Sequence, residues 1–177
     1  MQLCVIFYFS KEYYLQIMSK NKIKQLAKSP WKMKLYMLMN LPMGFIAGLK
    51  IIEITSEKSQ ISVPYKFINK NPFKSMYFAV QAMAAELSSG ILALSEVAEA
   101  SKPISMLVLN MKASFTKKAQ TKVVFTCNDG DKIRNAINQS IATGEGEIVD
   151  VRAVGIDDEG DQVAEFVFTW TFKPKKK

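Results

Sequence analysis

The middle of the chain carries an apolar stretch whose hydrophobic positions recur at the period of a helix. From about residue 74 to 97 this predicted helix is apolar on nearly every side, which is typical of a helix enclosed by other elements. One carboxylate, Glu86, interrupts the run among alanines, methionines and a leucine. Burying a carboxylate without a partner is costly, so Glu86 needs an explanation that packing alone does not give.

Past the central helix the pattern changes to an alternation of apolar and polar residues, which is typical of half-buried strands. Four such strands follow, and the last, "QVAEFVFTWTF", alternates throughout. A short helix, "GDKIRNAINQSIATG", interrupts them, and Gly144 is placed to end it. The expected apolar positions are Leu107, Leu109, Met111, Ala113 and Phe115 on one face of the first strand, Val123, Phe125 and Cys127 in the second, Ile133, Ile137 and Ile141 in the short helix, and Ala164, Phe166, Phe168, Trp170 and Phe172 in the last strand.

Two further strand-like runs precede the central helix, in "GLKIIEITSEKSQISVPYKFINKN". Ile61, Val63, Tyr65 and Phe67 alternate with polar residues in the second run. Pro64 has no N–H to donate and indicates an edge position or an irregularity. Antiparallel strands that curl around the central helix are the simplest enclosure for it. The sequence therefore predicts one α+β domain.

Residues 20–40 predict a further helix, broken or kinked near Pro30. Its apolar stripe allows two interpretations, a helix lying on an anionic membrane or a helix packed over the domain with its lysines in solvent. We favour packing, because one apolar stripe is the ordinary mark of a packed helix. The stripe consists of Ile23, Leu26, Trp31, Leu35 and Leu38.

The positive charge of the chain is concentrated at its ends. The 177 residues carry a formal net charge of +8. Residues 1–36 hold seven lysines against one glutamate, and residues 173–177 hold four lysines. The span 37–172 has 13 basic and 15 acidic residues. The body is close to neutral, so a nucleic-acid or membrane-surface binder would rest on the terminal lysines alone, and we expect neither partner.

Two amino-acid types limit the chemistry. Cys4 and Cys127 are too few and too far apart to suggest a disulfide framework or a metal site, which fits a reducing, cytoplasmic setting. Histidine is absent, which excludes Ser-His-Asp and Cys-His nucleophile systems and histidine-ligated metals. Acid–base chemistry must then come from carboxylates, lysine, tyrosine or bound water.

The N-terminal residues suggest where the domain begins. The opening "MQLCVIFYF" is too short for a membrane span and lacks the pattern of a signal peptide. Met18 begins "MSKNKIKQLAK", which resembles an ordinary start. We therefore expect residues 1–17 to be an extension, 18–40 a basic helix, 41–173 the domain and 174–177 a basic tail.

The stretch "NPFKSMYFAVQAMAAE" resembles the active-site segment of the phenylacetate-type acyl-CoA thioesterases. That segment has an Asn, a His-Gly-Gly six residues later, and an Asp or Glu nine residues after the His. Asn71 matches the Asn and Glu86 matches the acid. Tyr77, Phe78 and Ala79 stand in place of the His-Gly-Gly. The resemblance extends to "SFTKKAQTKVVF" and "DDEGDQVAEFVFTWTF", runs from about residue 40 to 172, and is greatest to a branch of unknown function.

The resemblance implies the hotdog fold, in which a curved antiparallel sheet of about six strands wraps the long central helix, here with an N-terminal helix and a short helical insertion. It implies an acyl-CoA thioesterase without a cofactor, coenzyme A being part of the substrate, and a homodimer or tetramer. Glu86 would activate water, or attack directly, at a thioester carbonyl polarised by the backbone N–H of Phe78. Hotdog dehydratases need a histidine and are disfavoured. The loss of His-Gly-Gly favours the competing class, a non-catalytic acyl-CoA or lipid-binding protein.

Each candidate residue has a structural alternative. Glu86 is either a catalytic carboxylate, which we favour, or a buried group satisfied by Gln81, Ser89 or a lysine. Asn71 either binds the thioester or the attacking water, or caps the helix. Ser89 either orients Glu86 or fills space on the helix.

The remaining candidates are expected to contact substrate. Tyr77 and Ala79 stand where the resemblance places the acyl thioester, although Tyr77 also suits the core. Lys117 and Lys118 follow a strand and suit the phosphates of coenzyme A, although a charged strand end is usually only solvated.

Overall fold

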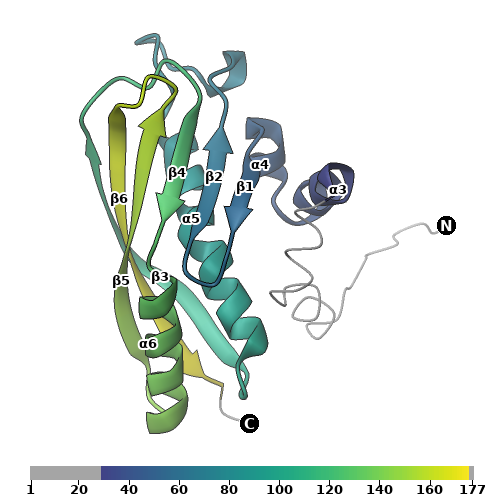
Figure 1. Ribbon diagram of the computed structural model, residues 1–177, viewed down its shortest axis with the longest axis vertical. Helices are drawn as coiled ribbons and strands as arrows, with labels where there is room; N and C mark the ends of the chain where they lie inside the picture. Colours follow the sequence, from purple (N-terminus) through teal and green to yellow (C-terminus); the bar gives the residue numbers. More distant parts are fainter. Residues whose placement is uncertain (1–28, 176–177) are drawn as a thin grey trace, which may run out of the picture.

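The computed structural model describes residues 29–175, so the predicted extension 1–17 lies outside the described residues. A long helix, α5 (Phe78–Glu99), packs against one face of a six-stranded antiparallel sheet (Figure 1). Helices α3 (Pro30–Asn40) and α4 (Pro42–Ala47) precede the sheet, and α6 (Gly130–Thr143) is inserted between two of its strands. The α+β hotdog arrangement predicted from the sequence is confirmed.

The order of strands across the sheet differs from their order in the chain. It is β1-β2-β4-β5-β6-β3, and neighbouring strands are antiparallel. The edges are therefore β1 and β3, and the chain crosses from one edge region to the other through α5. The bounds are β1 (Lys50–Ile54), β2 (Ser59–Val63), β3 (Ile104–Phe115), β4 (Val123–Cys127), β5 (Glu147–Asp157) and β6 (Gln162–Pro174).

The core lies between α5 and the sheet, and β6 supplies its largest side chains. Phe166, Phe168, Trp170 and Phe172 are all buried, as their alternation predicts. By length and hydropathy α5 passes for a membrane span, but 56% of its most apolar window is buried inside the molecule. The sheet accounts for its apolar character, so α5 is a core helix.

The short helix α6 confirms the sequence pattern in detail. Ile133 and Ile137 are buried against the core, and Ile141 is half-buried. Gly144 ends the helix with φ of +78°, a left-handed conformation that glycine adopts without steric cost.

The strand β2 is shorter than its alternation suggests. It ends at Val63, directly before Pro64, which has no N–H to continue the ladder. Phe67 then belongs to a 3₁₀ turn (Phe67–Asn69) and is 87% exposed. β2 pairs on both sides, with β1 and β4, so Pro64 marks a strand end and not an edge strand.

The strand β3 departs from its predicted single apolar face. A bulge between Val108 and Asn110 shifts its register against β6. Leu107 pairs with Thr171 on the outer face, whereas Met111 pairs with Phe168 on the face toward α5. The prediction that Leu107 and Met111 share a face is therefore wrong, because a bulge inserts one residue and reverses the alternation.

The helix α3 packs with a different face from the one predicted. Met33 and Met37 are buried, at 8% and 4% exposure. Trp31, Leu35 and Leu38 are 65%, 47% and 48% exposed, so the prediction that they pack over the domain is wrong. The methionines face α4, where Gly44 leaves room for Met37 and flexible thioether side chains fill such gaps well. Ile23 and Leu26 lie outside the described residues.

Candidate functional site

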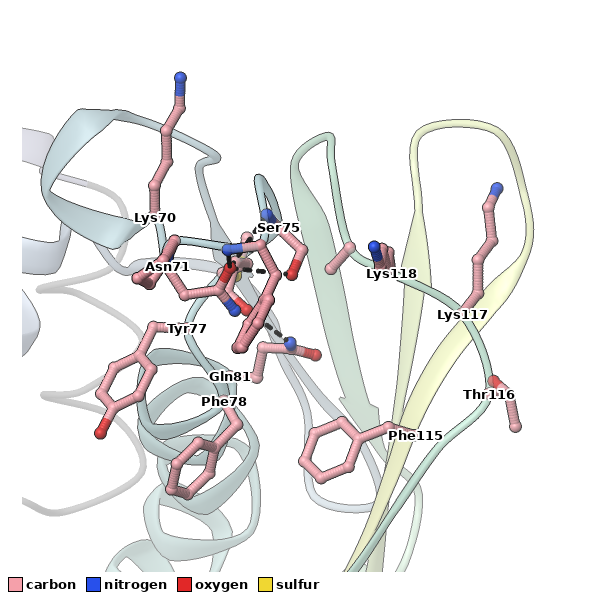
Figure 2. A pocket seen from close by; sticks show the side chains of 14 residues that line it. Lys70, Asn71, Ser75, Tyr77, Phe78, Gln81, Phe115, Thr116, Lys117 and Lys118 are labelled. Carbon is pink, nitrogen blue, oxygen red and sulfur yellow. Dashed lines mark hydrogen bonds between the residues drawn. The ribbon is translucent and has the colours of Figure 1, made fainter.

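A cavity of about 810 Å³ opens beside the N-terminus of α5 (Figure 2). One wall is the loop before α5 together with its first turn, and the other is the end of β3 with the loop that follows. The structure brings to this cavity five of the residues singled out in the sequence: Asn71, Tyr77, Phe78, Lys117 and Lys118.

The N-terminus of α5 has backbone N–H groups that are not hydrogen-bonded within the described residues. Tyr77 is its N-cap residue, and no side chain caps the helix. The N–H groups of Val80 and Gln81 donate to the Tyr77 carbonyl. Within the described residues the N–H groups of Phe78 and Ala79 have no acceptor. These two donors and the positive end of the helix dipole favour an oxyanion at this place.

Asn71 holds the loop in front of the helix. Its Oδ1 accepts hydrogen bonds from the N–H groups of Phe73 (3.0 Å) and Ser75 (3.2 Å) and from the Ser75 hydroxyl (3.2 Å), drawn as dashed lines in Figure 2. The suggestion that Asn71 caps α5 is wrong, because the loop uses its oxygen instead. Its side chain still lines the cavity.

Gln81 is a cavity residue that the sequence reasoning did not propose as one. It lies in the first turn of α5 and is only 4% exposed. Its Nε2 donates to the Met76 carbonyl at 3.3 Å, while its Oε1 has no partner in the described part of the chain. A buried unpaired acceptor costs about 1–3 kcal/mol, which a bound donor would recover. Gln81 could have been found from the sequence in the same way as Glu86, because both are polar residues in an apolar helix.

Glu86 lies further along α5 and does not line the cavity of a single chain. It is half-buried, and burial raises the pKa of its carboxyl above the ordinary value. Among the described residues no hydrogen bond or ion pair satisfies this carboxylate: Gln81 bonds to Met76, and Ser89 bonds to the main chain of Glu86. The alternative in which Gln81 or Ser89 satisfies Glu86 is therefore wrong.

Ser89 and Gly90 shape the surroundings of Glu86. The Ser89 hydroxyl donates to the Glu86 backbone carbonyl (3.1 Å) and accepts from Trp170 Nε1 (3.1 Å). Ser89 is fully buried, so it ties α5 to β6 behind Glu86. A Cβ on Gly90 would lie 3.0 Å from Glu86 Oε1, so the glycine leaves the carboxylate its space.

Two of the three lysines that line the cavity, Lys117 and Lys118, differ in their surroundings. Lys117 Nζ lies among the carboxylates of Asp157 (3.1 Å), Glu159 and Asp161 (2.6 Å). Hydrogen bonds to these carboxylates raise its pKa. They lie close enough together to hold a metal ion, but the Lys117 ammonium stands among them. Lys118 forms no ion pair within the described residues, so it is available to a ligand phosphate. The third lysine, Lys70, has its Nζ over the Tyr65 ring, 4.9 Å from the ring centroid.

Tyr77, Phe78 and Ala79, which stand in place of the His-Gly-Gly, lie at or beside the entrance of the cavity. Tyr77 and Phe78 are 46% and 51% exposed, and their rings meet edge to face at 4.9 Å. Figure 2 shows both rings on the helix side, with Phe115 facing them from the strand side. Ala79 is half-buried in the first turn. The entrance is therefore aromatic on both walls.

Comparison with known families gives one match over most of the chain. A family model described as "Domain of unknown function (DUF4442)" matches residues 30–172. A comparison with curated proteins returned no match.

Solved structures with the same fold include two proteins named as thioesterases and one described as a probable thioesterase. A Pseudomonas aeruginosa protein of unknown function, described as a probable thioesterase, has a TM-score of 0.68 at 19% identity, over 82% of this chain and 97% of that chain. A thioesterase from Haemophilus influenzae has a TM-score of 0.58 at 14% identity, over 79% and 88%. A mutant thioesterase from P. aeruginosa has a TM-score of 0.58 at 15% identity, over 81% and 94%. At these identities the similarity shows the fold alone.

Proposed function

The chain belongs to the DUF4442 family, and on that premise we propose that it hydrolyses acyl-CoA or a related acyl thioester. One observation carries the proposal. The half-buried carboxylate of Glu86 has no partner among the described residues, and it lies on the helix whose first residue, Phe78, lines the cavity and has a free N–H. Thioester hydrolysis needs a base and an oxyanion site, and each chain offers both. They are about 12 Å apart along α5, because Glu86 comes eight residues after Phe78.

In the proposed reaction the thioester carbonyl oxygen accepts a hydrogen bond from the Phe78 N–H. Glu86 takes a proton from a water molecule as the water oxygen attacks the carbonyl carbon. The negative charge that develops on the carbonyl oxygen is stabilised by the N-terminus of α5. The carbon–sulfur bond then breaks, and the thiolate leaves with the proton that Glu86 returns. Burial favours this role, because a raised carboxyl pKa makes a stronger base.

Three further contacts belong to the proposal. Lys118 binds a phosphate of coenzyme A, since Lys117 is already surrounded by carboxylates. Gln81 Oε1 accepts a hydrogen bond from the substrate or from the attacking water. Asn71 keeps the loop beside the thioester in shape through Ser75.

Because Glu86 lies outside the cavity of a single chain, we propose that the site is completed in a homodimer. Edge strand β3 exposes Leu107, Leu109, Met111 and Phe115, each between 42% and 60%. A second copy paired along this edge would cover these side chains and join the two sheets. The second copy would also lie against the face of β3 that points toward α5, next to the cavity wall formed by the end of β3.

The direct test is thiol release from a panel of acyl-CoAs of different chain length. We expect Glu86→Gln to lower kcat/KM by about 10²–10⁴-fold, the usual contribution of a general base. Glu145→Gln is the matched control, since Glu145 is exposed and follows α6, an element that contributes no residue to the cavity. The acid limb of the wild-type pH profile should lie above 4.5, the ordinary value for Glu. Equal turnover by Glu86→Gln and the wild-type chain would refute this assignment.

A non-catalytic acyl-CoA or lipid-binding protein is the second candidate. It is favoured by the aromatic rings of Tyr77 and Phe78, which occupy the entrance where thioesterases of the resembled type have histidine and glycine. This candidate predicts saturable binding of acyl-CoA without thiol release. Binding that is unchanged in Glu86→Gln would then assign Glu86 no part in recognition.

A further inference from the structure

The outer face of α3 is an exposed apolar ridge. We define the α3 ridge as Trp31, Leu35, Leu38 and Met39, which are 65%, 47%, 48% and 52% exposed. At 100° per residue these positions fall on one side of the helix, opposite the buried Met33 and Met37. The helix thus has two apolar faces, of which residues 29–175 cover only one. Contiguous exposed apolar patches are unusual on soluble monomers and mark interaction sites.

Lysines border the α3 ridge on both sides. Lys32 and Lys34 are exposed, and the helical period places one on each flank of the ridge. Between residues 13 and 52 the sequence has seven lysines and no aspartate or glutamate. Positive charge on both flanks of an apolar stripe that contains a tryptophan is the pattern of a helix lying in the interface of an anionic bilayer.

The position of α3 in the molecule suits such a contact. Figure 1 shows α3 at the outside of the fold, with α4 between it and the sheet. The neighbouring α4 adds Met43 and Ile46, which are 62% and 50% exposed. With 11 residues, α3 is too short to span a bilayer and long enough to lie along its surface.

We propose that the α3 ridge docks the protein on the surface of an anionic lipid bilayer. The apolar side chains enter the boundary between headgroups and acyl chains, and Lys32 and Lys34 contact the anionic headgroups. This reverses the sequence-based expectation of no membrane contact, which assumed that Trp31, Leu35 and Leu38 pack against the domain. The proposal does not depend on the proposed catalytic activity.

The test is co-sedimentation of the full chain with vesicles of phosphatidylcholine alone and of phosphatidylcholine with phosphatidylserine. We expect binding to the anionic vesicles only. Leu35→Ser/Leu38→Ser should weaken the partition at least tenfold, and Lys32→Gln/Lys34→Gln about thirtyfold, at about 1 kcal/mol per lysine. The controls are Ile148→Ser, an exposed apolar residue on the interior strand β5, and Lys112→Gln, an exposed lysine on β3. Both controls should bind like the wild-type chain.

Trp31 provides a second readout. The other tryptophan, Trp170, is buried, so a blue shift of emission and loss of iodide quenching on vesicle addition report on Trp31. Trp31→Phe should keep binding and lose the shift.

Two outcomes would overturn the proposal, and an added observation would reassign the ridge. The first is no binding to anionic vesicles. The second is equal binding by the wild-type chain and the Leu35→Ser/Leu38→Ser variant, which would assign the affinity to other lysines. If the first outcome is accompanied by a changed oligomeric state in the Leu35→Ser/Leu38→Ser variant, the ridge is assigned to a second copy of the chain.

Discussion

At the scale of single residues, Glu86 is held in an environment that favours its protonated form. Gly90 lies one turn further along α5 and leaves the carboxylate its space. Ser89 fixes the main chain of Glu86 from the buried side through Trp170. Burial removes water from the carboxylate, and no described residue replaces it. The cost of this arrangement should be measurable in the stability of the chain.

Glu86→Gln is expected to raise the free energy of unfolding at pH 8 by roughly 1 kcal/mol, because the neutral amide loses less hydration than the ionised carboxylate. The folded wild-type chain has the higher carboxyl pKa and binds this proton more tightly than the unfolded chain. Its stability relative to the variant should therefore rise as the pH falls through the folded pKa toward 4.5. Urea unfolding of both chains at several pH values measures the difference. A variant that is less stable at pH 8 would mean that the carboxylate has a stabilising partner.

At the scale of elements, α6 holds the turn between β1 and β2 against the central helix. The Gly130 N–H donates to the Glu57 carbonyl at 3.1 Å. Arg134 reaches the Ser56 carbonyl (3.1 Å), the Glu57 carboxylate (3.0 Å) and Glu96 of α5 (3.3 Å). The helical insertion thus links the turn between β1 and β2 to the central helix α5.

Gly130→Ala is expected to destabilise the chain by about 1–3 kcal/mol, the usual cost of overpacking. A Cβ at this position would lie 2.2 Å from the Ser56 carbonyl oxygen, so the backbone of the turn must move. Gly146→Ala is the control, because the nearest atom to its Cβ, in Lys173, is 3.7 Å away. Thermal unfolding of both variants gives the comparison. Equal unfolding temperatures for Gly130→Ala and Gly146→Ala would show that the turn between β1 and β2 moves aside without a measurable cost in stability.

At the scale of the whole molecule, β3 ends the sheet with a long unpaired edge. Its exposed apolar residues lie on both faces of the strand, because the bulge at Val108–Asn110 reverses the alternation. Natural edge strands are usually shielded by charges or bulges. This one carries a bulge but few charges, since Lys112 is its only charged residue. An edge of this composition suits pairing with a second copy.

Light scattering after size-exclusion chromatography is expected to give a dimer for the wild-type chain. Leu109→Glu/Met111→Glu should shift it to the monomer, because charges desolvated between paired edges are costly. Ile148→Glu is the control, as Ile148 is equally exposed but lies on the interior strand β5. A monomeric wild-type chain would contradict the homodimer and leave Glu86 at an open surface.

The sequence by itself determined the elements in which apolar residues recur at the spacing of a helix or a strand. The enclosed helix, the alternating β6 and the isoleucine face of α6 could all be predicted, because burial on all sides, on one face or on one stripe leaves a local pattern. The spacing from Asn71 to Glu86 also indicated where a site would form. The cavity at the start of α5 is lined by Asn71 and Phe78 but not by Glu86, so the site itself stays a prediction.

Only the tertiary structure decided which groups meet. The face that α3 turns inward, the carboxylates around Lys117, and the unpaired oxygen of Gln81 depend on residues distant in the chain. An apolar helix face has the same pattern whether it meets a neighbour or remains exposed, and a lysine has the same identity in solvent and among carboxylates. A bulge likewise leaves no mark in the alternation until the partner strand fixes the register. Contacts between distant segments, and not local period, therefore set the chemistry of this protein's surfaces and cavity.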